Sequence, residues 1–117
     1  MKITYNEIKL ANEPLYQLSK EKVSVKEAVG IARIIKSIRD EVAICQEKER
    51  EIVEKYGTVD EKGNYKFADE VISDLNREFG ELIGYEVDID ITPVKLSSDI
   101  KIDANTVMIL EKFIDFE

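Results

Sequence analysis

The chain has 117 residues, of which 44% are hydrophobic and 36% are charged, so it can bury the core of one domain and is too apolar to be disordered. The net charge of −8 and the pI of about 4.7 disfavour non-specific binding to nucleic acid or to an anionic membrane. The single Cys predicts a chain without an internal disulfide in a reducing compartment, and the lack of an apolar run of membrane-spanning or signal-peptide length predicts a soluble, intracellular protein.

The first expected helix follows a short extended lead at residues 2–5. Thr4 and Glu7 have the spacing of a capping box, which predicts a helix that begins there and runs to about Ser19. Pro14 lies inside this stretch, so the helix either kinks there or begins later.

The second expected helix, from Ser24 to Tyr56, is the longest element. Ser24 and Glu27 form a capping-box pattern, Gly57 marks the end, and no Pro lies between them. At about 1.5 Å per residue the helix is roughly 50 Å long. An unbroken three-four spacing marks one side of it: Ala28, Ile31, Ile35, Ile38, Val42, Cys45, Glu49, Ile52 and Tyr56.

This seam needs cover from other segments or from a second copy of the chain. A homo-oligomer, most simply a dimer, is therefore expected. The candidate interface residues are Ile31, Ile35, Ile38 and Val42. Cys45 lies on the same seam, which predicts a buried apolar side chain rather than a nucleophile.

The remaining elements are shorter. Residues 57–66 are rich in turn residues and can form a small hairpin between Thr58–Val59 and Tyr65–Phe67. A third helix is expected over Ala68–Ile83, with an inward stripe that comprises Ala68, Ile72, Leu75, Phe79 and Leu82.

After Gly84 the spacing of the apolar residues changes from three or four to two. Residues Tyr85–Ile91 alternate apolar and acidic side chains, as in a half-buried strand, and Pro93 ends the run. Val94–Leu96 and Ile100–Ile102 are shorter extended candidates. Asp103 can cap a last helix from Ala104 to about Asp115, with Val107, Leu110 and Ile114 inward.

Together these elements predict a mainly α fold in one domain, residues 1–117. Its long central helix has two antiparallel flanking helices, forming a helical hairpin or bundle over residues 1–84. A small β element and a short C-terminal helix occupy residues 85–117.

Three charged groups are candidate sites, each with an ordinary alternative. The row Glu86, Asp88 and Asp90 is a weak metal candidate for Mg²⁺ or Mn²⁺, or simply a solvated strand face. A second group can mimic phosphates for a basic partner, or is ordinary surface charge: Glu47, Glu49, Glu51 and Glu54. A basic flank either faces solvent or binds an acidic partner: Lys22, Lys26, Arg33, Lys36 and Arg39.

Charge is also divided along the chain. Residues 1–39 hold 8 Lys/Arg and 4 Asp/Glu, whereas residues 40–117 hold 9 Lys/Arg and 21 Asp/Glu. The two parts can attract each other or a second copy in antiparallel register, or each segment can solvate its own outer face.

Three stretches resemble a family of small uncharacterised proteins encoded by bacteriophages and prophages. They are VSVKEAVGIARIIK at residues 23–36, EIVEKYG at 51–57 and EVDIDITPVKLS at 86–97. The resemblance implies a phage setting, in the host cytoplasm or associated with the virion, and it implies no catalytic residues.

No Ser/His/Asp set, Gly-rich phosphate loop, Cys pair or nucleotide motif is present, so no catalytic residue and no cofactor is expected. The sequence favours a non-catalytic acidic protein-interaction module that binds and modulates or inhibits a host or anti-phage defence protein. One alternative is a phage structural or assembly factor that acts through helix packing. Another is a metal-dependent enzyme that uses the Glu86 row.

Overall fold

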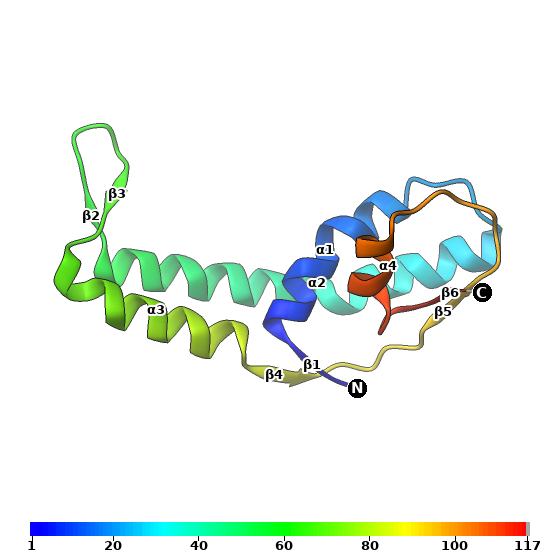
Figure 1. Cartoon of the computed structure of the whole chain (residues 1–117). Coiled ribbons are helices and arrows are strands. Elements are labelled where there is room, and N and C mark those ends of the chain that lie inside the picture. The colour runs from blue at the N-terminus through cyan, green and yellow to red at the C-terminus, as the bar shows by residue number, and fades with distance from the viewer. Residues whose placement is uncertain (117) are drawn as a thin grey trace.

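The computed structural model describes residues 1–116 as a mainly helical chain with three small two-stranded sheets. It is elongated, with extents of 51 × 30 × 24 Å. The long helix α2 (Val25–Tyr56) runs through the whole molecule, and the other elements lie along it (Figure 1). We call residues 46–83 the arm and the rest of the described chain the head.

Helix α1 (Tyr5–Leu18) lies against the head's part of α2. The predicted capping box is confirmed: the Glu7 amide donates to Thr4 Oγ1, and the Thr4 amide donates to the Glu7 carboxylate. Pro14 stands inside the helix without ending it. The start expected at Thr4 is therefore correct, and the alternative of a later start is wrong.

The capping box of α2 is also confirmed, since Ser24 and Glu27 exchange the two expected hydrogen bonds. The buried side of α2 differs from the predicted seam at its beginning. Ala28 is exposed, whereas Ile34 is 2% exposed. The reason is that segments pack against α2 from two directions here, α1 on one side and strand β5 (Val94–Leu96) on another.

The arm consists of the end of α2, a hairpin and helix α3. Strands β2 (Thr58–Val59) and β3 (Tyr65–Lys66) pair antiparallel, and the hairpin projects away from the two helices (Figure 1). Helix α3 (Asp69–Ile83) returns along the second half of α2.

Strand β1 (Lys2–Thr4) pairs antiparallel with β4 (Glu86–Asp88), so the start of the chain lies beside the end of the arm. The strand predicted over residues 85–91 is thus shorter than expected. Ile89 and Ile91 lie beyond it and are still 7% and 8% exposed, because their side chains enter the head's core.

The C-terminal prediction is partly wrong. Helix α4 (Ala104–Leu110) begins after its Asp103 cap as expected, but it ends five residues early. Phe113 donates its amide to the Leu110 carbonyl in a turn, and β6 (Ile114–Phe116) then pairs parallel with β5. Ile114 is buried as predicted, but in a strand; Ile100–Ile102 form no strand.

The head holds nearly all of the core. Its largest fully buried side chains include Phe113, Ile8, Leu15 and Ile31. Over the arm, Leu75 is the single side chain that counts as buried among the described residues. None of the helices in residues 1–116 has the length and apolar character needed to cross a membrane.

Candidate interaction surfaces

The acidic strand row is exposed and does not form a metal-binding group. The side chains of Glu86, Asp88 and Asp90 all face solvent, on the side opposite to Val87 and Ile89, as the alternation predicted. The N-terminal ammonium group lies 3.0 Å from Asp88 Oδ1. Within residues 1–116 no three Asp, Glu or Cys side chains are grouped so that they could hold a metal ion.

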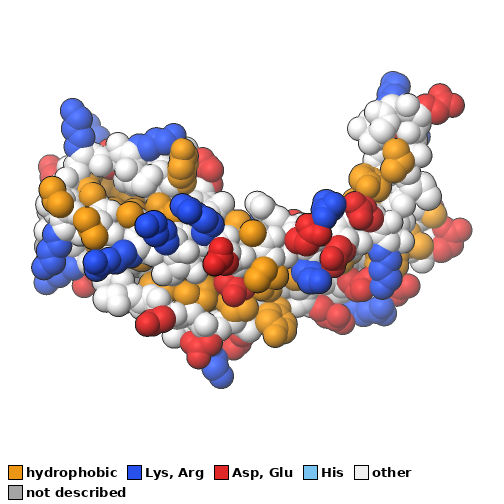
Figure 2. Space-filling model, turned by 180° about the vertical axis from the view of Figure 1, so that it is seen from behind, with side chains coloured by type: hydrophobic (Ala, Val, Ile, Leu, Met, Phe, Trp, Pro, Cys, Tyr) orange, Lys and Arg blue, Asp and Glu red, His pale blue; other side chains and the backbone are white. Residues whose placement is uncertain are grey.

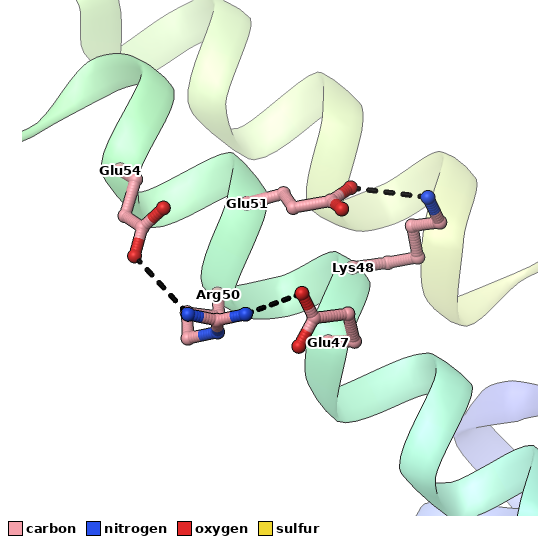
Figure 3. A network of polar contacts seen from close by, with 5 residues as sticks. All are labelled: Glu47, Lys48, Arg50, Glu51 and Glu54. Carbon is pink, nitrogen blue, oxygen red and sulfur yellow. Dashed lines mark hydrogen bonds and ion pairs between the residues drawn. The ribbon is translucent and has the colours of Figure 1, made fainter.

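The four glutamates near the end of α2 are all engaged within the chain. Arg50 lies between Glu47 and Glu54, and Lys48 lies 3.1 Å from Glu51 (Figure 3). These are i,i+3 and i,i+4 pairs between side chains about half exposed, and such pairs contribute little to stability. An incoming Lys or Arg can therefore replace the internal partner at small cost.

Glu49 differs from the other three because it is half-buried between the helices. Lys9 of α1 lies 3.1 Å from its carboxylate, and the Cys45 thiol donates to it over 3.4 Å. Burial, reinforced by Glu49, raises the pKa of Cys45 to about 11. Cys45 is thus a protonated thiol that is 3% exposed, in line with the buried position that the sequence predicts.

The proposed oligomer-interface residues are not equally available. Ile31 and Ile38 are each 1% exposed within a single chain, and Ile35 and Val42 are half-buried against the same core. The head therefore covers this part of the seam without a second copy. Ile35 and Val42 keep part of their surface accessible, so they stay candidates for a contact between copies.

Glu27 has a structural role that its capping-box pattern only partly reveals. Besides Ser24, its carboxylate accepts from the amides of Ser97 and Ser98, at 2.8 and 3.1 Å, and from the Ser98 hydroxyl. These hydrogen bonds, first that from the Ser98 hydroxyl and next that from Ser24, lower the pKa of Glu27 to about 2. Glu27 fastens the segment after β5 to the start of α2, and no local sequence signal could have identified a partner 70 residues away.

The junction of head and arm contains a second buried polar contact. Tyr5 donates its phenol to Glu41 over 2.8 Å, and its ring stacks on Tyr85 at 5.9 Å. Burial and the neighbouring Glu41 raise the pKa of Tyr5 to about 12. In the described chain no buried side-chain nitrogen or oxygen lacks a hydrogen-bond partner. The buried polar side chains of the described residues are therefore satisfied within the chain.

The arm exposes much of the apolar surface that its helix patterns were expected to bury. Ile72 of the predicted α3 stripe is 38% exposed, and Phe79 and Leu82 are only half-buried. A groove of about 360 Å³ lies between α2 and α3. Ile52 and Leu82 provide its apolar surface, and its charged lining comprises Lys48, Glu51, Lys55, Glu78 and Glu81.

Comparisons with protein-family models, with curated proteins and with solved structures gave no significant match to this chain.

Proposed function

We propose that this chain is a non-catalytic protein-interaction module whose arm binds an amphipathic, basic segment of another protein. In the phage setting implied by the sequence resemblance, that protein is a host or anti-phage defence protein that the module modulates or inhibits. The observation that carries this proposal is the difference in burial between the head and the arm.

The arm consists of two helices and a hairpin with no third layer. Two helices can cover only the sides that face each other, so each leaves part of its apolar stripe accessible. The side chains concerned are Ile72, Phe79 and Leu82 of α3 and Ile52 of α2, all exposed or half-buried. A partner helix laid along the groove between α2 and α3 would remove this surface from water.

Charge complementarity supports a basic partner. Residues 46–83 hold 11 Asp/Glu and 6 Lys/Arg, a net charge of −5. Glu51, Glu78 and Glu81 line the groove, so Lys or Arg side chains that flank an apolar residue would meet carboxylates there. Glu47 and Glu54 lie outside this lining, on the outer side of α2, and Glu49 holds the arm to α1.

The test uses a defined probe, an 18-residue helical peptide of Leu and Lys, titrated into isotopically labelled chain. We expect chemical-shift changes on the arm and weaker binding by an Ile72→Asp variant. Met108→Asp is the matched control, because Met108 is an exposed apolar residue of the head at 65% exposure. Equal binding by both variants, or shift changes confined to the head, would contradict the proposal.

A second candidate, a structural or assembly factor, is supported by the same apolar stripe. Two arms packed side by side would form a four-helix bundle and give the expected dimer. Light scattering at low and high salt decides between the two. A salt-resistant dimer that Ile72→Asp dissociates favours assembly, and a monomer favours binding of another protein.

A further inference from the structure

The outer side of α2 changes character where the head meets the arm. In the head, four basic side chains and two valines share the exposed side: Val25, Lys26, Val29, Arg33, Lys36 and Arg39. At 100° per residue they fall within about 140° of the helix circumference, opposite Ile31 and Ile38. We call these six residues the basic face. Figure 2 shows Lys and Arg side chains gathered on the head, whereas both signs of charge mix along the arm.

The cations of the basic face are not used within the chain. Among the ion pairs of residues 1–116, none involves Lys26, Arg33, Lys36 or Arg39. The chain has a net charge of −8, and five glutamates of the arm have cationic partners within it: Glu47, Glu49, Glu51, Glu54 and Glu78. An acidic chain thus keeps a group of unneutralised cations on one side of a rigid helix.

The basic face also carries apolar surface at helical spacing. Val25 is 81% exposed and Val29 is 44% exposed, one turn apart on the same side of α2. A face that only had to be solvated has no physical need for two exposed valines between lysines. Their presence favours a partner that brings apolar contacts together with negative charge.

The length of the basic face disfavours polyanions that extend along α2. From Lys26 to Arg39 the helix rises about 20 Å. Asp40, Glu47 and Glu54 follow on the same side of the helix. A nucleic-acid duplex or a lipid surface that lay along α2 would reach these carboxylates and be repelled, whereas a short peptide segment can end before them.

We propose that the basic face is a second binding surface, which docks a short acidic segment of another protein through Arg33, Lys36 and their neighbours, with Val25 and Val29 contacting its apolar side chains. It is separate from the arm and carries the opposite charge. The proposal therefore does not depend on what the arm binds.

The test measures binding of a fluorescent 14-residue peptide of Glu and Leu to the full chain by anisotropy. We expect affinity to fall as salt rises from about 50 to about 300 mM, since screening weakens exposed charge pairs. Arg33→Glu/Lys36→Glu should weaken binding about tenfold, because two attractions become repulsions. Lys62→Glu/Lys66→Glu is the control with the same change in net charge, and it should alter affinity less than about twofold.

A Val25→Ser/Val29→Ser variant tests the apolar contribution separately and should weaken binding at both salt concentrations. The proposal is overturned by equal effects of the two charge-reversal variants, or by loss of peptide binding on Ile72→Asp. It is also overturned if duplex DNA or phosphatidylserine vesicles bind the face as tightly as the peptide. The proposal is likewise refuted if light scattering shows a dimer and cross-linking shows that a second copy of the chain covers the basic face.

Discussion

Replacement of Gly30 by Ala tests the packing that closes the head. A Cβ added at Gly30 would lie 2.6 Å from Cγ2 of Val94, well inside the ordinary contact distance between carbons. Val94 is a buried residue of β5, 9% exposed, and its strand pairs with β6. The new methyl group therefore has to displace a buried side chain on a strand that is fixed by its pairing with β6.

The magnitude follows from two opposing effects. Ala is favoured over Gly inside a helix by about 1 kcal/mol. An extra methyl in a well-packed core costs about 1–3 kcal/mol. The net expectation for Gly30→Ala is a loss of about 1 kcal/mol in the free energy of unfolding, in spite of the better helix former.

Gly80→Ala is the matched control. Gly80 also lies inside a helix, α3, but a Cβ there meets nothing within 4 Å. Only the helix preference remains, so this variant should gain about 1 kcal/mol. The two variants should differ by about 2 kcal/mol, or roughly 8 °C in Tm for a domain of this size.

Urea unfolding and thermal melts followed by circular dichroism measure both variants. A Gly30→Ala chain as stable as Gly80→Ala would refute the reasoning, because β5 would then not be packed tightly on α2. Adding Val94→Ala to Gly30→Ala refines the test. Since the methyl groups that clash are gone, the double variant should lose less stability than the sum of the single losses.

Three further predictions follow from the buried polar groups. The folded pKa of Glu27, about 2, lies below its ordinary 4.5, so its contribution to stability is present above pH 4.5 and is lost as the pH falls towards 2. Glu27→Gln, which has one acceptor oxygen instead of two, should have a lower urea midpoint than the unchanged chain at pH 7. The difference between the two midpoints should shrink as the pH falls towards 3. Tyr5 holds its proton to about pH 12, so its contribution to stability is lost as the pH rises above 10. The hydrogen bond with Glu78 also raises the pKa of Tyr56, so two of the five tyrosines should ionise late in an absorbance titration of the folded chain, and Tyr5→Phe should remove the one that ionises near pH 12. Cys45, buried and with a pKa of about 11, should react with a thiol reagent at pH 8 only at the rate of unfolding, and fast reaction of the folded chain would contradict its position.

Local signals in the sequence predict where the helices begin, but they do not predict which distant segments pack against them. The two capping boxes, at Thr4 and Ser24, specify helix starts by contacts three residues apart, and both are formed. The C-terminal helix was overextended because Ile114 fits a helical spacing from Leu110. Ile114 instead lies in strand β6, where it pairs with Val94, and no local sequence pattern encodes that pairing.

Periodicity also indicates which side of a helix is apolar without saying how much covers it. The seam of α2 continues at the same spacing on both sides of Cys45, and α3 has an equally regular stripe. In the head, both α1 and β5 pack on α2, whereas along the arm α3 packs on it. In the sequence, Glu49 is the one sign of this difference in cover. It is a charged residue on the apolar seam, and beyond it no residue of α2 is fully buried.

Along α2, the part packed by α1 and β5 is also the part with the basic face, and the part packed by α3 lies in the acidic arm. From Lys36, in the basic face, to Ile52, in the arm groove, α2 rises about 24 Å without a break. Two partners bound at these places would be held apart at a fixed distance, and neither would reach the other's surface. Each peptide probe, titrated separately, should therefore respond only to changes on its own surface: Arg33→Glu/Lys36→Glu should leave the affinity for the basic peptide unchanged, and Ile72→Asp should leave the affinity for the acidic peptide unchanged. Loss of both affinities in either variant would mean that the two probes use one surface.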